Sequence, residues 1–287
     1  MAEARVAVAA DTDGICALLH DRMSAEIPVR DWRRLMTYDW LPAKPDLGGV
    51  IEEEGRIVGY MGVIYAERRR NRRSFTTGNL TSWYVERPYR EGGLALGLLR
   101  ICTRRRDVVY TSFTSTSKAL PLLRLAGLRP LDAARYAWRR GAGRPAGDIT
   151  VVSGAKAVAP LLGVIERRLV ADHAALAVHP CLLRADAGDC LVMLSVHAKT
   201  EAPARFDALY IGAPDILAAN AQAFADAILP SGEAELTVDR RFLGDGASGG
   251  ELQEIRVPRC YRPIEGLEPA DIDILYSEIE LLDLKLW

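Results

Sequence analysis

Hydrophobic positions recur at helical spacing near the start of the chain. Over residues 11–23, apolar side chains return every three or four residues behind two capping candidates, Asp11 and Thr12. The spacing predicts an amphipathic helix, whose apolar positions are Ile15, Leu18, Leu19 and Met23. An Arg-rich and Trp-rich segment follows over residues 28–40.

Apolar stretches then predict strands. Residues 48–67 hold two such stretches on either side of Glu53–Arg56, which indicates a β-hairpin with Gly55 near its turn. Residues 75–85 are rich in Thr and aromatics and predict a third strand that ends before Pro88. A helix from Gly93, a strand over 108–114, a helix over 117–128 and a strand over 134–140 complete the first half. The order contains a βαβ unit, so we expect an α/β fold with a mixed central sheet and flanking helices.

A short Gly- and Pro-containing segment divides the chain near its midpoint. We expect residues 1–140 and 149–287 to form two domains joined by a linker over 141–148. The second half predicts strands over 190–196, 206–212 and 234–242 and a helix over 213–229. This order is loosely that of the first half without its glycine loop, so the second α/β domain is either a degenerate second copy or unrelated.

The C-terminal segment over 271–287 carries apolar residues at helical spacing. These residues are Ile272, Leu275, Ile279 and Leu282. We expect a helix that docks on the second domain or on another subunit, so an oligomer through this segment is one interpretation.

Composition narrows the class of protein. The 287 residues are 49% hydrophobic and 26% charged, as in globular domains, and the net charge of -1 gives no reason to expect nucleic acid as a partner. Five cysteines without a CxxC pair and four histidines without ligand spacing favour reduced thiols and no metal site. The N-terminus lacks the layout of a signal peptide, and no stretch approaches the roughly 18 apolar residues of a membrane helix. We therefore expect a cytoplasmic protein.

The candidate chemistry lies where the third strand passes through a short loop into a helix. Two adjacent glycines let backbone N–H groups turn inward, and the positive end of the helix dipole faces the same point. Arg90 adds a fixed positive charge. The loop matches neither GxGxxG nor the P-loop pattern. Paired glycines are also typical of a plain tight turn, but together these features indicate a pyrophosphate site formed by Arg90, Glu91, Gly92, Gly93, Leu94 and Ala95.

This segment resembles the acyl-CoA-binding loop of the GNAT superfamily of N-acyltransferases, R/Q-x-x-G-x-G/A, here Arg90-x-x-Gly93-x-Ala95. Downstream, many members carry N-x-x-A-x-x-x-Y-x-x-x-G-F, where this chain has Thr116-x-x-Ala119-x-x-x-Leu123-x-x-x-Gly127-Leu128. Two positions match and three depart. The resemblance covers roughly residues 4–140.

The resemblance implies an N-acyltransferase that uses acetyl-CoA or another acyl-CoA. The primary amine of a small acceptor would attack the thioester directly in a ternary complex. Main-chain groups of Trp83, Tyr84 and Val85 would bond the pantetheine arm, and the N–H groups from Glu91 to Ala95 would hold the pyrophosphate.

Catalytic groups are harder to assign. The Tyr that commonly protonates the leaving thiolate corresponds to Leu123, and the strand before the loop has no carboxylate for a general base. Ser82, Tyr84 and Ser115 are our catalytic candidates, although the hydroxyls of residues 115–117 alternatively cap the next helix.

Two rival functions follow from these departures. One is a non-catalytic CoA-binding sensor or assembly protein of the same fold. The other is a long-chain acyltransferase at a membrane surface, which would use the run Arg68–Arg73 that is otherwise a solvated loop. The aromatic residues Trp32, Tyr38 and Trp40 form either an acceptor pocket or part of the core.

Overall fold

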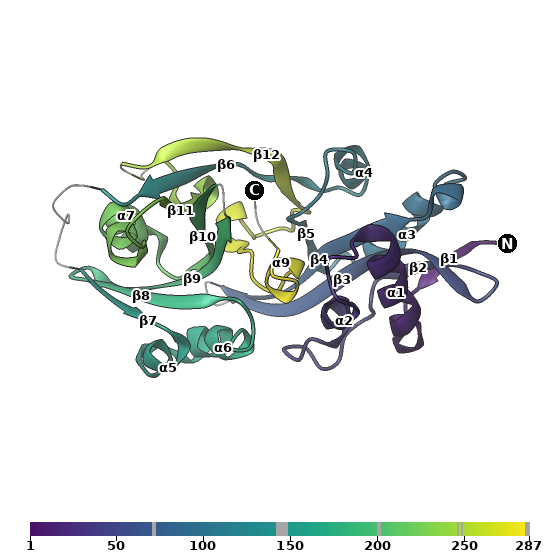
Figure 1. Cartoon of the computed structure of the whole chain (residues 1–287), viewed down its shortest axis with the longest axis horizontal. Helices are drawn as coiled ribbons and strands as arrows, with labels where there is room; N and C mark the ends of the chain where they lie inside the picture. Colours follow the sequence, from purple (N-terminus) through teal and green to yellow (C-terminus); the bar gives the residue numbers. More distant parts are fainter. Residues whose placement is uncertain (71–72, 142–148, 200–201, 246, 248, 285–287) are drawn as a thin grey trace. The chain divides into compact units, whose positions relative to one another are not determined.

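The computed structural model describes residues 1–70, 73–141, 149–199, 202–245, 247 and 249–284, which form two compact units (Figure 1). Unit 1 comprises Met1–Leu131, Arg259–Glu268 and Tyr276–Leu284, and unit 2 comprises Asp132–Pro258 and Pro269–Leu275. Two segments that the sequence suggested for the C-terminal domain therefore lie in unit 1. The expected linker over 141–148 lies outside the described residues except for residue 141, and the expected boundary at 140 stays a prediction.

Unit 1 contains a mixed sheet with the order β1-β2-β3-β4-β5-β12. Its strands are β1 (Glu3–Val6), β2 (Gly49–Glu53), β3 (Arg56–Arg70), β4 (Arg73–Val85), β5 (Val108–Ser112) and the end of β12 (Glu251–Tyr261). All neighbours are antiparallel except β4 and β5, which run parallel. The mixed sheet predicted from the sequence is confirmed, and so is the hairpin, which turns at Glu54 and Gly55 with positive φ angles.

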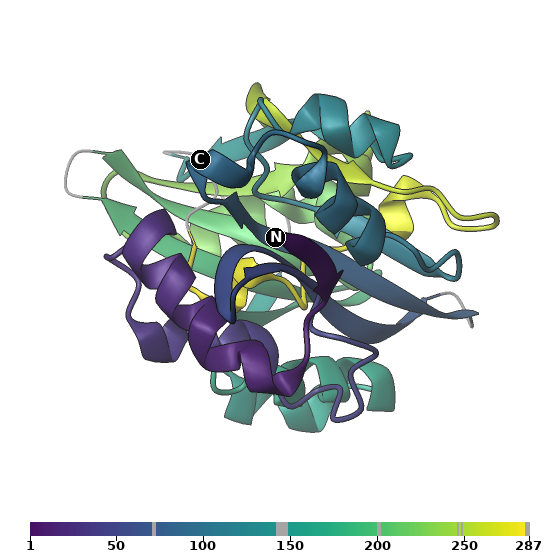
Figure 2. The same ribbon diagram turned by 90° about the vertical axis from the view of Figure 1, so that its right-hand side faces the viewer.

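Helices cover both faces of this sheet (Figure 2). On one face lie α1 (Thr12–Leu18), a π-helical turn over Leu19–Met23 and α2 (Val29–Thr37). On the other face lie α3 (Leu94–Cys102) and α4 (Leu120–Leu125). Side chains of β3, such as Met61, Val63 and Tyr65, pack with Leu98 and Leu99 of α3 in one apolar core.

The strands of unit 2 follow one another in the order β7-β8-β9-β10-β11-β6. Its strands are β6 (Arg129–Arg139), β7 (Thr150–Ser153), β8 (His179–Ala185), β9 (Gly188–Lys199), β10 (Ala202–Ile211) and β11 (Ala234–Asp239). Only β10 and β11 run parallel. Its helices are α5 (Ala155–Val158), α6 (Val164–Asp172), α7 (Pro214–Ile228) and α8 (Arg240–Leu243).

The two halves of the chain repeat one order of elements. Each has a strand, two helices, three antiparallel strands, a helix, a strand parallel to the previous one, a helix and a last strand. The last strands are exchanged, because β6 pairs with β11 and β12 pairs with β5. The interpretation of the second half as a degenerate copy is therefore confirmed at the level of topology.

The predicted C-terminal helix is wrong in extent. Among residues 272–284, only α9 (Glu278–Leu281) is helical, and the residues before it are irregular, with Tyr276 at a φ of 63°. Three of the four predicted apolar residues are nevertheless buried, since Ile272, Leu275 and Ile279 are each 1–3% exposed, whereas Leu282 is half-buried. These three side chains are thus packed within the folded chain, and an oligomer through this segment stays a prediction.

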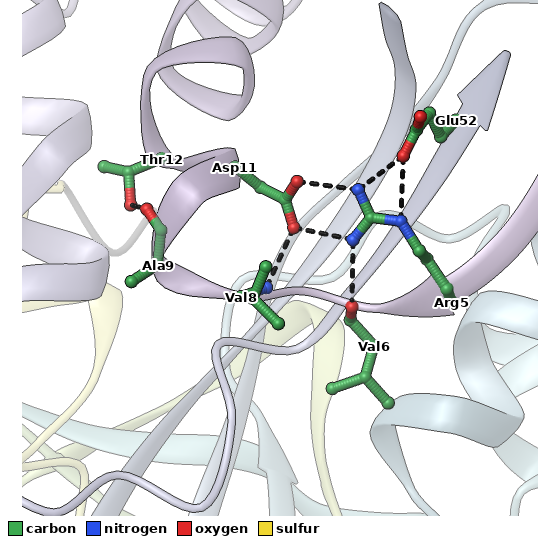
Figure 3. Close-up of polar contacts among 7 residues, drawn as sticks. All are labelled: Arg5, Val6, Val8, Ala9, Asp11, Thr12 and Glu52. Carbon is green, nitrogen blue, oxygen red and sulfur yellow. Dashed lines mark hydrogen bonds and ion pairs between the residues drawn. The ribbon is translucent and has the colours of Figure 1, made fainter. Parts of the chain in front are cut away.

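A partly buried ion pair joins the first strand to the turn before the first helix (Figure 3). The two terminal nitrogens of Arg5 each donate to a different carboxylate oxygen of Asp11 at 2.7 Å, and its Nε donates to Glu52 at 2.9 Å. The amide of Val8 also donates to Asp11, at 2.8 Å. Asp11, expected to cap the helix with its side chain, instead ties β1 and β2 to the turn before α1.

This cluster predicts a pH-dependent contribution to stability. The hydrogen bonds from Arg5 lower the pKa of Asp11, so the contribution is present above the unfolded pKa of about 4 and is lost as pH falls through the lower folded pKa. We expect Asp11→Asn to lower the free energy of unfolding by about 1 kcal/mol at pH 7, a modest value because Arg5 is partly exposed. The difference should shrink towards pH 3 in denaturant titrations. Asp13→Asn, which removes an exposed ion pair between α1 and Arg33, is the control. It should leave the free energy of unfolding at pH 7 and its change towards pH 3 nearly the same as in the wild type.

Candidate active site

Strands β4 and β5 separate partway along their length. They pair from Thr76 and Val108 to Asn79 and Thr111, after which β4 continues beside β3 as far as Val85. A β-bulge lies just beyond the last paired residue, because Ser82 and Trp83 both stand opposite Met61 of β3. Ser82 has a φ of 52°, which is uncommon for a residue with a side chain and occurs often at functional sites. The bulge re-aims the end of β4 and leaves a gap beside β5.

A pocket of about 110 Å³ lies in this gap. Its residues come from both faces of the sheet. Met23, from the turn after α1, and Thr81 lie on the face of α1 and α2, whereas Leu80 and Leu123 belong to the core on the face of α3 and α4. The gap therefore joins the two faces. The other lining residues are Met61, Ser82, Trp83, Ser112, Thr114, Ser115, Thr116 and Ala119.

The glycine loop leads from the end of β4 to α3. Gly92 and Gly93 have φ angles of 76° and 85°, and no atom lies within 4 Å of the place where a Cβ would stand at either residue. The amide of Gly97 bonds to the carbonyl of Gly93, so the amides of residues 94–96 belong to the first turn, where a helix offers them no carbonyl. An exposed loop with open space and free N–H groups is the geometry of an anion site.

The residues before the glycines are held in place by side chains. Arg56 forms two hydrogen bonds to Glu86, at 2.8 and 3.0 Å, and the hydroxyl of Tyr89 donates to Glu53 at 2.5 Å. The Nε of Arg90 donates to the carbonyl of Val85 at 2.8 Å. The loop thus starts from a fixed base at the end of β4, and the guanidinium of Arg90 keeps four further N–H donors.

The structure brings some of the predicted catalytic residues to the pocket and leaves one outside it. Ser82 and Ser115 line the pocket, and Ser115 shares a hydrogen bond with Ser112. Tyr84 is not among the lining residues, and its ring lies 5.7 Å from the guanidinium carbon of Arg90. Leu123 is 1% exposed and lines the pocket. It is the residue that the sequence comparison aligned with the Tyr that commonly protonates the thiolate.

The alternative that hydroxyls of residues 115–117 cap the next helix is wrong. Helix α4 begins at Leu120 with Ala119 at the N-cap and no side-chain cap. A backbone turn closed by the Ala119 amide and the Thr116 carbonyl separates these hydroxyls from the helix. The hydroxyl of Ser115 therefore does not cap α4; it shares a hydrogen bond with Ser112.

Sequence reasoning missed a buried carboxylate beside the pocket. Glu278, the first residue of α9, is 1% exposed and accepts a hydrogen bond from the hydroxyl of Thr114, which lines the pocket. Burial, together with the negative charge of Glu280, raises the pKa of Glu278 to about 7. No pattern near Thr114 points to this partner, because it lies 164 residues further along the chain.

The corresponding place in unit 2 is built differently. Strand β10 has a bulge at Leu209, which corresponds to the bulge of β4. The amide of Ile274 donates to the Leu209 carbonyl at 2.9 Å, so the carbonyl at this bulge already has a hydrogen-bond partner within the chain. The connection to α7 is Gly212-Ala213-Pro214, which has no glycine pair and places a proline, without an N–H, in the first turn. The anion-binding geometry of unit 1 is thus not repeated.

The contacts of the aromatic residues Tyr38 and Trp40 and of the arginine run settle two alternatives that the sequence left open. Tyr38 and Trp40 are buried and stack at 4.6 Å, and the indole of Trp40 donates to the carbonyl of Tyr65 at 3.0 Å, which assigns both rings to the core. Arg68 lies 4.6 Å from the ring of Tyr276, and Arg73 donates to the carbonyls of Glu265 and Gly266. Both ends of the arginine run are therefore engaged within unit 1.

Comparison with known proteins identifies the fold. The sequence matches no family model and no curated protein. Solved structures are similar to it. A GCN5-related N-acetyltransferase from Anabaena variabilis has 8% identity and a TM-score of 0.57, and covers 91% of this chain and 72% of its own. Another GCN5-related N-acetyltransferase, from Kribbella flavida, has 11% identity and a TM-score of 0.57. The match covers 91% of this chain and 70% of that protein.

A third solved structure is similar over nearly its whole length. A putative acetyltransferase from Pyrococcus horikoshii has 14% identity and a TM-score of 0.51, and covers 98% of this chain and 95% of its own. The chain therefore has the fold of the GCN5-related N-acetyltransferases, and the likeness includes both units. Within the described residues, no helix combines the length and apolarity needed to cross a membrane.

Proposed function

We propose that this protein is an acyl-CoA-dependent N-acyltransferase whose active site is the gap between β4 and β5. The observation that carries the proposal is the open bulge of β4 joined directly to an exposed glycine loop and a helix N-terminus. One end of this arrangement suits a pyrophosphate and the other suits a thioester. An acyl-CoA molecule has both groups, joined by the pantetheine arm.

The loop would hold the pyrophosphate with its backbone. The amides from Glu91 to Ala95 supply donors, and the space that a Cβ would fill at Gly92 and Gly93 is free for phosphate oxygens. Arg90 adds a positive charge beside them, and charge-assisted hydrogen bonds are about twice as strong as neutral ones. Main-chain groups of Trp83, Tyr84 and Val85 would bond the pantetheine arm beside the gap.

The pocket would then receive the acyl group. Leu80, Met61 and Leu123 line it with apolar side chains, which suit the hydrocarbon part of an acyl group. The engagement of Arg68 and Arg73 within unit 1 weakens the case for a membrane-surface enzyme.

The reaction we propose is direct attack by a primary amine of a small acceptor. The bulge of β4 leaves an amide outside the strand ladder, and this N–H would polarise the thioester carbonyl. Because both reactants meet in one pocket, proximity and orientation supply much of the acceleration. Leu123 cannot protonate the leaving thiolate, so Ser82 or the bonded pair of Ser115 and Ser112 would do so, directly or through water.

Calorimetric titration with acetyl-CoA tests the loop, and release of free thiol over a panel of small amines tests the reaction. We expect micromolar binding and turnover on at least one amine. Arg90→Glu should weaken binding about tenfold or more, which is about 1.4 kcal/mol. Arg100→Glu makes the same change of charge on the exposed side of α3 and should bind nearly as the wild type does. Equal binding by both variants would contradict the proposed loop, and binding without turnover on any amine would support the sensor.

A further inference from the structure

Glu278 is an unusual group for the interior of a small protein. Its side chain is 1% exposed, one carboxylate oxygen accepts from Thr114, and the other oxygen, Oε2, has no hydrogen-bond partner among the described residues. A buried carboxylate with an unpaired oxygen costs stability, since its desolvation is not compensated. Such a group is explained most simply by a role in which it gains a proton or a partner.

The carboxylate lies on the side of the sheet from which an acceptor would reach the gap. Helix α9 packs against α2, which covers the same face as α1. Asn79 and Thr81 of β4 project to this face, and Thr81 lines the pocket. Asn79, which is 2% exposed, donates to Thr111 at 3.2 Å while its Oδ1 also has no partner among the described residues. Two unpaired acceptors on one face suit a ligand that is rich in N–H donors, such as an ammonium group.

We propose that Thr114 and Glu278 form the proton-accepting pair of this site, with Thr114 in contact with the acceptor amine and Glu278 acting through it. The inference rests on the proposed N-acyltransferase function. It assigns the general base that the strand before the loop does not provide, and it identifies the acceptor as an amine that arrives in its protonated form.

The proton transfers balance as follows. The ammonium group gives one proton to the Thr114 oxygen while the Thr114 hydroxyl proton moves along its existing hydrogen bond to Glu278. The freed lone pair of the amine forms the C–N bond, and the C–S bond breaks as the tetrahedral intermediate collapses. The proton that the nitrogen loses after attack passes to the leaving thiolate through Ser82 or the bonded pair of Ser115 and Ser112, and Glu278 returns its own proton to water through Thr114 when the products leave.

The surroundings of Glu278 suit a base that works near neutral pH. On its own helix, Glu280 accepts from the amide and hydroxyl of Ser277, and its charge helps to raise the pKa of Glu278 to about 7. From β3, Arg68 faces the ring of Tyr276. The buried residues of α2 are Trp32, Leu35 and Met36, which are uncharged. The Thr114 hydroxyl and the backbone amide of Glu278 lower the pKa, but burial outweighs them.

The pH dependence of kcat/KM tests this pair. Because Glu278 must be ionised to accept a proton, we expect kcat/KM of the wild type to rise with pH and to level off above about pH 7. Glu278→Gln keeps the shape of the side chain and should lower kcat about 100-fold and remove the inflection near pH 7. Acetyl-CoA affinity, measured by calorimetry, should stay within about twofold of the wild type, because the pair lies away from the glycine loop.

Matched substitutions of Thr114 separate the relay from a structural effect. Thr114→Ser keeps the hydroxyl and should retain most activity and the inflection, whereas Thr114→Val keeps the shape and should lose both. The proposed proton transfer through Thr114 to Glu278 would be overturned if the wild type is active and Glu278→Gln keeps both its kcat and its inflection near pH 7. Equal activity of the two Thr114 variants would overturn it as well. A wild type that binds no acetyl-CoA, or transfers no acyl group, would overturn the proposed function itself, which is a different outcome.

Discussion

Gly93→Val is expected to weaken acetyl-CoA binding about 30-fold or more. Gly93 has a φ of 85°, a conformation in which a β-branched residue is strained by about 1–3 kcal/mol. Relief of that strain moves the backbone N–H groups out of the cradle, and the new side chain occupies the open space where we place the pyrophosphate. A loss of about 2 kcal/mol corresponds to about 30-fold in the dissociation constant. Calorimetric titration of the variant with acetyl-CoA measures it.

Gly55→Val provides a control with the same backbone strain. Gly55 lies in the hairpin turn between β2 and β3 with a φ of 78°, and it too has no atom within 4 Å of an added Cβ. Both variants should lose a similar amount of folding stability, but Gly55→Val should bind acetyl-CoA as the wild type does. Similar affinities in the two variants would show that the glycine loop does not hold the ligand.

Arg241→Met should destabilise unit 2 by about 3–5 kcal/mol, because it removes a buried cation from two buried carboxylates. Arg241 is 4% exposed and bonds to Asp132 at 2.6 Å and to Asp239. Its Nε also donates to the carbonyl of Ile272 at 3.0 Å, which holds the C-terminal segment against α8. Burial lowers the pKa of the guanidinium, but the carboxylates favour its charged form. Denaturant unfolding followed by circular dichroism measures the change.

The neighbouring Arg240 is the matched control for this substitution. It pairs with Asp245 at the surface, where the two side chains are 47% and 84% exposed. Exposed ion pairs contribute little, so Arg240→Met should leave the unfolding midpoint unchanged. A small effect from both substitutions would contradict the importance of the buried pairing of Arg241 with Asp132 and Asp239.

The parts of the site that are close in sequence could be predicted from the sequence. The strand, the glycine pair and the helix that follows them are consecutive, and the backbone conformation of Gly92 and Gly93 depends mainly on local sterics. The resemblance also aligned Leu123 with the Tyr that commonly serves as acid, and Leu123 lines the pocket, because helix α4 follows β5 after a short connection.

The parts that depend on distant contacts could not be predicted. Thr114 meets Glu278 only in the folded chain, and no local pattern marks a buried carboxylate. The C-terminal segment has a helical period because most of its apolar residues are buried, and burial on several sides produces the same pattern as one helix face. The exchange of β6 and β12 is equally hidden, since the alternation of polar and apolar residues in a last strand does not specify which strand it pairs with.

A crystal structure of the protein with acetyl-CoA tests the central claim most directly. We predict one molecule per chain, with the pyrophosphate on the amides between Glu91 and Ala95 and the thioester between β4 and β5. The bulge of β10 should remain bonded to the chain through Ile274. Acetyl-CoA bound at unit 2, or bound without contact to the glycine loop, would contradict the account.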